Sequence, residues 1–448
     1  MEKIKPRTLS GFMELLPGPQ SQMDAVLDVL RETYALFGFV NIDTPILEAS
    51  EVLLAKGGGE TEKQIYRFEK GDTDLSMRFD LTVPLAKYVA MNYGQLAFPF
   101  RRCQIGKVYR GERAQRGRFR EFYQADVDVI GDGSLDPANE AEMVAVICET
   151  FRRLGLSRFV IRMNNRRFLN GLFEYLGLKE QSAAVLGAID KLEKIGREKV
   201  LEVLCALDGV TPESAGQLLD IVSAEDPEGM LDSLSGKSEA LDKGISELRQ
   251  VTGLLPAFGV PADKWKLDLT IARGLDYYTG TVYETTLLDY PEVGSVCSGG
   301  RYDDLAEYYT DKKLPGVGVS IGVSRLFFIL QDQGLLREEA VRPPCDALVI
   351  PMGDVLDAAV TASTALRSAG VRTQLYMEQK KVKAKFAYAD KLGVPYAVVV
   401  GEEEKQNGTV ALKDLRSGDQ ETMTAAEAAK IILEGLPSRA APVQEKRK

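Results

Sequence analysis

Arginines flanking a short loop are the residues of this chain best suited to phosphate chemistry. The first segment reads YRGER at 109–113 and contains Arg110 and Arg113, and a second segment starts near Arg118. Two strands joined by such a loop would direct several guanidinium groups at one place. A guanidinium binds two oxygens at once and does not deprotonate, so this spacing predicts a phosphate-binding hairpin.

Two further segments combine arginine with tyrosine or glycine. One reads ARGLDYYTG at 272–280. The other reads GVGVSIGVSRL at 316–326, where the glycines permit close approach of the backbone and Arg325 begins an expected helix. Each segment alone also fits a structural role, such as an arginine at a turn beside packed tyrosines. Their combination in one chain is what indicates a site.

The second strand of the expected hairpin alternates with period two. Apolar or aromatic side chains occupy one face, at Phe119, Tyr123, Ala125, Val127 and Val129. The other face carries Arg118, Arg120, Phe122, Gln124, Asp126 and Asp128. This alternation predicts a strand with one face against a core. A row of polar side chains on a sheet usually faces solvent, and the pattern alone leaves that alternative open.

Helices and strands are expected around this hairpin. Apolar residues at three- or four-residue spacing predict an amphipathic helix over 19–37. A strand over 39–46 follows, although it contains Pro45, which points to an edge or to the end of pairing. From 166 to 261 Leu, Ala, Glu and Lys dominate, which predicts a helical insertion, and strand character returns at 266–284.

The C-terminal part predicts a separate small domain. After Pro343 and Pro344 the pattern becomes β-α-β-α-β over 347–401, and Thr424 with Glu427 forms a capping box before a last helix. These elements predict an α/β domain with a mainly parallel sheet. A loose tail is expected from residue 438 onward.

Composition limits the function classes. The 448 residues allow two or three domains, and no apolar run is long enough for a transmembrane helix. No secretory signal is expected at the N-terminus, and a cytoplasmic protein is expected. Five scattered cysteines without a C-x-x-C pair, and no histidine, argue against a structural metal or a disulfide framework. The net charge of −10 does not suggest nucleic-acid binding, although net charge says nothing of local basic patches.

Together and in this order, the three arginine segments resemble the class II aminoacyl-tRNA synthetases. The segment around Arg273 resembles the histidine-specific signature of the histidyl-tRNA synthetases, and further likenesses occur at Pro45, RFDLT at 78–82, SGGRYD at 298–303 and YADKLG at 388–393. The resemblance implies an α+β catalytic domain with an antiparallel sheet. The implied boundaries are 1–165 and 262–335 for that domain, 166–261 for its helical insertion, 345–437 for an α/β anticodon-binding domain and 438–448 for a flexible tail.

The resemblance implies a two-step ligase reaction. L-histidine and ATP, the latter with Mg²⁺, would give histidyl-adenylate and pyrophosphate, and histidine would then pass to the 3′ end of its tRNA. A cytoplasmic homodimer without a membrane partner is implied as well. No editing domain is expected, because a site that pairs with a polar side chain rejects analogues by roughly 10⁴–10⁵-fold on its own.

The resemblance also implies roles for individual residues. The two catalytic arginines, Arg110 and Arg273, would approach the α-phosphate from opposite sides. ATP would contact Arg110, Glu112, Phe122 and Arg325. Histidine would contact Asp80, Thr82, Arg110, Gln124, Asp128, Arg273, Tyr277 and Tyr278, with Asp128 and Tyr278 facing the imidazole. The tRNA would contact Arg113, Arg116 and Arg118.

The chain departs from the commonest bacterial form of the family at two places. Asp80 and Asp128 stand where many bacterial members carry glutamate, a change of one carboxylate for another. A non-catalytic paralogue, such as the regulatory subunit of ATP phosphoribosyltransferase, is the main alternative. Such paralogues usually lack the C-terminal domain and lose parts of the ATP and histidine motifs. A binder of tRNA-like structures is a third possibility, but it would not need an intact Arg273 motif.

Overall fold

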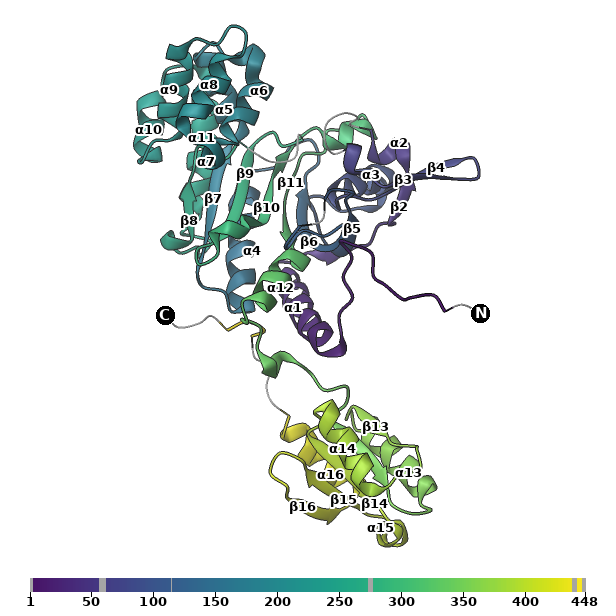
Figure 1. Ribbon diagram of the computed structural model, residues 1–448. Coiled ribbons are helices and arrows are strands. Elements are labelled where there is room, and N and C mark those ends of the chain that lie inside the picture. Colours follow the sequence, from purple (N-terminus) through teal and green to yellow (C-terminus); the bar gives the residue numbers. More distant parts are fainter. Residues whose placement is uncertain (1–2, 56–61, 114, 273–276, 437–440, 445–448) are drawn as a thin grey trace. The chain divides into compact units, whose positions relative to one another are not determined.

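The computed structural model describes residues 3–55, 62–113, 115–272, 277–436 and 441–444, and Figure 1 shows its elements. The chain forms two compact units. The first consists of Met1–Leu15, Met23–Leu336 and Val443–Lys448, and the second of Leu16–Gln22 and Arg337–Pro442. All residues predicted for the site belong to the first unit.

An eight-stranded sheet forms the centre of the first unit, in the order β1-β5-β6-β11-β10-β9-β7-β8. Its strands are β1 (Val40–Asn41), β5 (Phe100–Tyr109), β6 (Glu121–Ile130), β7 (Phe159–Asn165), β8 (Trp265–Leu267), β9 (Thr281–Leu287), β10 (Ser295–Tyr302) and β11 (Gly316–Gly322). Neighbouring strands are antiparallel except at the two edges, where β1 pairs with β5 and β8 with β7 in parallel. The predicted α+β fold with an antiparallel sheet is confirmed.

The two faces of β6 differ as the alternation predicts. Ala125, Val127 and Val129 are fully buried, in a core shared with α1 (Pro17–Leu36), α4 (Ala138–Leu154) and α12 (Val323–Asp332). The opposite face is not open to solvent, because Asp126 and Asp128 are each only 2% exposed. The alternative of a solvated polar face is therefore wrong at these two positions.

The predicted strand over 39–46 is wrong in its extent. Pairing with β5 covers only β1, and the chain next pairs at β2 (Leu47–Ala49) in a separate three-stranded sheet, with β4 (Thr73–Met77) and β3 (Arg67–Lys70). Pro45 lies between the two short strands, where its missing N–H interrupts a ladder. Two helices follow nearby, α2 (Ser50–Leu53) and α3 (Thr82–Asn92).

The segment predicted to be a helical insertion is helical. It contains α5 (Arg166–Tyr175), α6 (Ser182–Ile189), α7 (Leu192–Ile195), α8 (Arg197–Cys205), α9 (Pro212–Val222), α10 (Pro227–Leu234) and α11 (Glu239–Leu254). These helices gather into one group at the ends of β7 and β9, where α5 directly follows β7 (Figure 1). Their buried residues, among them Phe168, Leu172 and Leu248, continue the core of the sheet.

The second unit has the predicted order of elements. It contains β12 (Ala347–Pro351), α13 (Leu356–Ser368), β13 (Thr373–Leu375), α14 (Val382–Leu392), β14 (Tyr396–Val400), α15 (Glu402–Asn407), β15 (Val410–Asp414), β16 (Gln420–Met423) and α16 (Ala425–Glu434). In the sheet β13-β12-β14-β15-β16 the first three strands are parallel and the last two antiparallel. The predicted capping box is present, with Thr424 and Glu427 bonded to each other's backbone N–H.

The expectation of a loose tail from residue 438 is wrong for residues 441–444. Val443 is 1% exposed, and its N–H donates to the carbonyl oxygen of Leu154 at 3.1 Å. Val443 also forms a β-bridge with Leu336. The N–H of Gln444 also donates to the carbonyl oxygen of Leu335 at 2.9 Å, so backbone hydrogen bonds hold these residues on the first unit.

Candidate active site

The hairpin β5–β6 positions the first predicted catalytic arginine. Its strands pair continuously from Phe100 with Ile130 to Tyr109 with Glu121, so Arg110 leaves the end of β5 beside the start of β6. The guanidinium of Arg110 lies 5.3 Å from the ring centre of Phe122, and its Nε donates to the carbonyl oxygen of Phe79 at 3.1 Å. An aromatic ring and a carbonyl oxygen thus orient this cation.

A cavity of ≈ 380 Å³ opens on the polar face of β6. Most of the predicted site residues line it, namely Asp80, Thr82, Arg110, Glu112, Arg118, Phe122, Gln124, Tyr277, Tyr278 and Arg325. The structure therefore brings together residues that are as far as 245 positions apart in the sequence, from Asp80 to Arg325. We call the side near Arg110 and Arg325 the nucleotide end, and the side near Asp80 and Asp126 the amino-acid end.

At the nucleotide end, the first turn of α12 presents Arg325. Its Nη1 donates to the carbonyl oxygen of Ser295 at 3.0 Å, and its Nη2 donates to that of Val293. Both carbonyls belong to the segment that enters β10. The planar guanidinium of Arg325 and the aromatic ring of Phe122 thus line the same cavity.

The amino-acid end is built around Asp80, which is 2% exposed. The N–H of Val83 donates to its Oδ1 at 3.1 Å, and the hydroxyl of Tyr277 donates to its Oδ2 at 3.4 Å. Burial raises the pKa of Asp80 to about 6, although both hydrogen bonds and the charge of Arg110 act to lower it. The rings of Tyr277 and Tyr278 meet edge to face.

Asp128, which is expected to face the imidazole, is not among the residues that line the cavity. Its Oδ1 accepts from the hydroxyl of Tyr302 at 2.5 Å, and its Oδ2 lies 2.6 Å from Nη2 of Arg102. Arg102 is fully buried, so this carboxylate is the charge partner that permits its burial. The carboxylate extends over Gly318, where any Cβ would lie 2.1 Å from Asp128 Oδ1, as the predicted close backbone approach requires.

Asp126 and Ser320 line the cavity, although neither was predicted as a site residue. Nε2 of Gln124 donates to Oγ of Ser320 at 2.7 Å, and a hydrogen bond from Ser320 acts to lower the pKa of Asp126. Burial nevertheless raises that pKa to about 7. The signal was present in the sequence, since Asp126 belongs to the polar face of the alternating strand.

The predicted tRNA-binding arginines lie in the loop of the hairpin and are exposed. Arg116 pairs with Asp332 of α12 at 2.5 Å, and Arg118 lines the cavity, with its Nη1 3.9 Å from the Glu112 carboxylate. Arg113 does not line the cavity. The other predicted catalytic arginine, Arg273, lies outside the residues that the structure describes.

Comparison with known proteins decides the family. The family model described as Histidyl-tRNA synthetase matches residues 11–326, more than half of the chain. The chain belongs to the histidyl-tRNA synthetase family. The family model of an anticodon binding domain matches residues 346–435, which comprise the sheet and helices of the second unit.

Relatives and solved structures agree with this membership. The Histidine--tRNA ligase of Clostridium tetani is 50% identical over 433 residues, covering 96% of this chain and 98% of that protein. The one of Stenotrophomonas maltophilia is 47% identical, covering 92% of this chain and 94% of that protein. The crystal structure of histidyl-tRNA synthetase from Nostoc sp. PCC 7120 has a TM-score of 0.84 at 38% identity, covering 97% and 100%.

A Bacillus halodurans structure bears on the fold alone. It is described as an ATP phosphoribosyltransferase regulatory subunit/histidyl-tRNA synthetase, and it has a TM-score of 0.73 at 21% identity over 89% of this chain and 99% of that one. That protein shares this fold, and the fold alone does not determine the function.

No helix among the described residues is both long and apolar enough to cross a membrane. Within the same part of the chain, no three cysteine or carboxylate side chains are grouped so that they would hold a metal ion.

Proposed function

We propose that the chain activates L-histidine with ATP, which forms histidyl-adenylate and pyrophosphate, and then transfers the histidyl group to the 3′ end of its tRNA. One observation carries the proposal: a single cavity is lined both by Arg110 with Phe122 and by the buried carboxylates of Asp80 and Asp126. A phosphate ester and an ammonium group are the partners that these two sets of side chains favour.

The main alternative, a regulatory paralogue, is less well supported. The ligases that resemble this chain cover nearly all of it at 45–50% identity, and the region matched as an anticodon-binding domain is present. The arginines needed for nucleotide chemistry, Arg110 and Arg325, both line the cavity. A protein without catalysis has no need to hold both of them there.

At the nucleotide end, the chain's own cations act on developing charge. Arg110 would contact the α-phosphate while the ring of Phe122 stacks on adenine, Glu112 contacts the adenine edge, and Arg325 covers the other face of the base. Charges fixed in place before the reaction stabilise negative charge as pyrophosphate leaves, without reorganisation. Mg²⁺ would arrive with ATP as part of the nucleotide substrate.

Arg273 would be the second catalytic cation. This assignment rests on the resemblance of the segment 272–280 to the histidine-specific signature of the family. Two guanidiniums on opposite sides of one phosphate would neutralise more charge than either one, because each meets different oxygens.

At the amino-acid end, Asp80 would bind the α-ammonium group. Thr82, Gln124 and Tyr277 line the same part of the cavity and supply hydroxyl and amide oxygens. Burial raises the pKa of Asp80 to about 6, and an incoming ammonium would bring it down again by direct charge pairing. Histidine binding would thereby complete the ionisation of this carboxyl.

The tRNA would approach along the exposed loop that carries Arg113, Arg116 and Arg118. We further propose a cytoplasmic homodimer, as the family resemblance implies. Three large apolar side chains near the short strands β1 and β2 support an interface there, because Val40 is 53% exposed, Ile46 40% and Leu47 43%. Light scattering of the purified chain, with Leu47→Glu as the test variant, measures the oligomeric state directly.

Histidine-dependent exchange of pyrophosphate into ATP tests the reaction. The purified chain is incubated with ATP, labelled pyrophosphate and each of the twenty amino acids in turn. Exchange with histidine alone, followed by charging of total tRNA with labelled histidine, is the expected result. If the well-folded chain exchanges with no amino acid, the ligase proposal is wrong, and co-purification with an ATP phosphoribosyltransferase catalytic subunit would be tested next.

A further inference from the structure

The segment SGGRYD at 298–303 covers the end of β10, and none of its residues takes part in the proposed chemistry. Arg301 and Asp303, both of which the structure describes, are not among the residues that line the active-site cavity. Gly300 lies against the ring of Tyr278, because a Cβ there would lie 2.9 Å from Cδ1 of that ring. This close approach places the end of β10 directly beside a tyrosine of the amino-acid end.

Asp303 connects three parts of the first unit through its two carboxylate oxygens. Its Oδ1 accepts from Nε of Arg301 at 2.9 Å, and its Oδ2 accepts both from Oγ1 of Thr279 and from Nη2 of Arg167, each at 2.7 Å. Thr279 directly follows the two tyrosines of the amino-acid end, and Arg167 lies on α5, the first helix of the insertion. We call these four residues the junction. One oxygen atom at the junction links the insertion to the residue that follows the tyrosines.

Backbone hydrogen bonds hold the junction together as well. The N–H of Thr279 donates to the carbonyl oxygen of Arg301 at 2.8 Å, and the N–H of Asp303 donates to Oγ1 of Thr279 at 3.1 Å. The N–H of Arg166, the first residue of α5, donates to the carbonyl oxygen of Gly280 at 2.8 Å. The start of the insertion, the residues after the tyrosines and the end of β10 are therefore bonded to one another.

The charges of the junction lie largely out of solvent, which strengthens their interactions. Asp303 is 8% exposed. Burial acts to raise its pKa, but the two guanidiniums and the hydroxyl that contact it hold that pKa below its ordinary value. The other arm of the Arg167 guanidinium donates to Glu247 on α11. A planar guanidinium that binds two carboxylates at once fixes them relative to each other, so Arg167 joins α5 and α11 to the carboxylate that holds Thr279.

We propose that Arg167 and Asp303 are positioning residues for the reaction, through which the helical insertion holds Tyr277 and Tyr278 in place for histidine. The inference rests on the proposed function and extends it to helices of which no described residue lines the cavity. Arg167 acts on Asp303, and Asp303 acts on Thr279, which continues the chain from the tyrosines. Coupling between two sites is reciprocal, so histidine bound at the tyrosines stabilises the start of α5 in turn.

Arg167→Gln tests the proposal by histidine-dependent pyrophosphate exchange. The variant should fold, because Asp303 keeps Arg301 as its charge partner and Glu247 keeps the amide of Asn165 at 3.1 Å. We expect the KM for histidine to rise by about 3–10-fold, the usual effect of losing one hydrogen bond, with the KM for ATP within about twofold. An equal rise in both KM values would overturn the proposal, since the amino-acid end would not be affected selectively.

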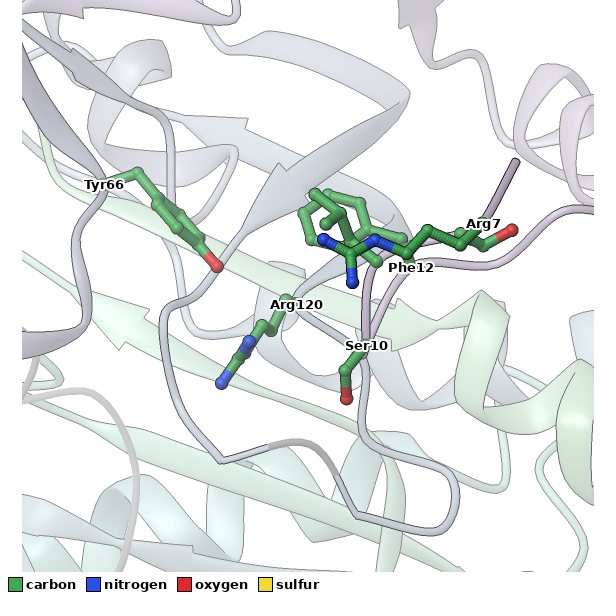
Figure 2. A pocket seen from close by; sticks show the side chains of 7 residues that line it. Arg7, Ser10, Phe12, Tyr66 and Arg120 are labelled. Atoms are coloured by element: carbon green, nitrogen blue, oxygen red, sulfur yellow. The ribbon is translucent and has the colours of Figure 1, made fainter. Parts of the chain in front are cut away.

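Arg7→Gln is the matched control, because it also replaces one guanidinium by an amide. Arg7 lines a separate cavity of ≈ 480 Å³ together with Phe12, Tyr66 and Arg120 (Figure 2). None of the residues that line this second cavity belongs to the junction. We expect Arg7→Gln to leave the KM for histidine unchanged. The same KM for histidine in Arg7→Gln and Arg167→Gln would overturn the proposal.

Thr279→Val removes the other donor to the shared oxygen, and it provides a measurement that does not depend on the folding of Arg167→Gln. It should also raise the KM for histidine by about 3–10-fold. The double variant should raise that KM by less than the product of the two single effects, because the second change breaks a connection that the first has already broken. The full product would show that the two residues act independently, and it would overturn the proposal.

Hydrogen exchange of the backbone amides in α5 separates positioning from a merely structural role. Saturating histidine should slow this exchange in the wild-type chain by a factor like that of the KM change, about 3–10-fold, and should no longer slow it in Arg167→Gln. A structural role alone would speed the exchange in the variant equally with and without histidine, and that result would overturn the proposal. Failure of the proposed function is distinguishable, because the wild-type chain would then show no histidine-dependent pyrophosphate exchange.

Discussion

The two ends of the active-site cavity hold their charged groups in opposite ways. At the nucleotide end, Arg110 and Arg325 remain partly exposed and donate to backbone carbonyl oxygens of Phe79, Ser295 and Val293. At the amino-acid end, Asp80 and Asp126 are each 2% exposed, and burial raises the pKa of both.

The difference indicates that the nucleotide end stabilises charge, whereas the amino-acid end recognises a side chain. A cation oriented by a neutral carbonyl, as Arg110 is by that of Phe79, keeps its full charge for a phosphate, whatever base or amino acid accompanies it. A buried carboxyl without a hydrogen-bond donor destabilises the site until a ligand with a matching donor binds. Buried carboxyls therefore discriminate strongly between ligands. We therefore expect changes at the nucleotide end to lower rates and changes at the amino-acid end to alter stability, pH response and histidine affinity.

The largest effect is expected at the buried ion pair behind the amino-acid end. Asp128→Ala leaves Arg102 fully buried with its charge unpaired, which should lower the free energy of unfolding by about 3–5 kcal/mol. Urea denaturation followed by circular dichroism measures the change. The double variant Asp128→Leu with Arg102→Met should recover part of the loss, because it removes both charges. A loss below about 1 kcal/mol would mean that water compensates Arg102.

At the nucleotide end, Arg110→Ala should lower the rate of exchange by about 10²–10³-fold, the usual effect of losing one preorganised charge-stabilising group. Arg273→Ala is expected to have an effect of the same size. The free energy of unfolding should hardly change for Arg110→Ala, because that side chain is partly exposed and its loss leaves no buried charge. A rate within about threefold of the wild type would refute the assigned role.

The pH dependence of stability should reveal the buried carboxyls. The pKa of Asp126 rises from 3.8 to about 7 and that of Asp80 from 3.8 to about 6, so the folded chain keeps protons that the unfolded chain releases. These two carboxyls therefore contribute most to the free energy of unfolding below about pH 4. Their contribution decreases as the pH rises from there, and it is lost once the pH has passed about 6 for Asp80 and about 7 for Asp126. Arg102, Asp128 and Ser320 face Asp126 and modulate this window.

Asp126→Asn sharpens that prediction, because asparagine does not titrate. Between about pH 5 and pH 7 the decline in the free energy of unfolding should be smaller in the variant, by on the order of 2 kcal/mol. Urea denaturation of both proteins at several pH values provides the comparison. Parallel curves for the two proteins would show that Asp126 titrates at its ordinary pKa.

Local patterns explain how much of this site the sequence predicts. The period-two alternation of β6 correctly separates Val127 from Asp126 and Asp128, because adjacent side chains on a strand must point to opposite faces. The same period leaves Asp126 and Asp128 equivalent. Which of them lines the cavity depends on Tyr302 and Arg102, which come from other strands and occupy Asp128.

Long-range packing accounts for the other differences between the predicted and the observed structure. The strand expected over 39–46 divides between two sheets, because β5 and β4 offer edges to different parts of it and Pro45 lies between them. The docking of Val443 depends on the backbone of Leu154, which no local pattern near residue 443 contains. The helix α1 (Pro17–Leu36) agrees within two residues with the predicted range 19–37, because its apolar residues at three- or four-residue spacing form a local pattern.

The smallest effect is expected at Arg325, the residue of the nucleotide end that would contact the uncharged adenine base. Arg325→Lys keeps the charge but loses the planar fork that donates to Ser295 and Val293. Its cation–π contact with adenine should weaken, which raises the KM for ATP by about 3–30-fold, while the KM for histidine stays near the wild-type value. Arg158→Lys, at an exposed ion pair with Asp289, is the matched control. If the KM for histidine rose as much as that for ATP, the two ends of the cavity would be one coupled site, and the separation of charge stabilisation from side-chain recognition would not hold.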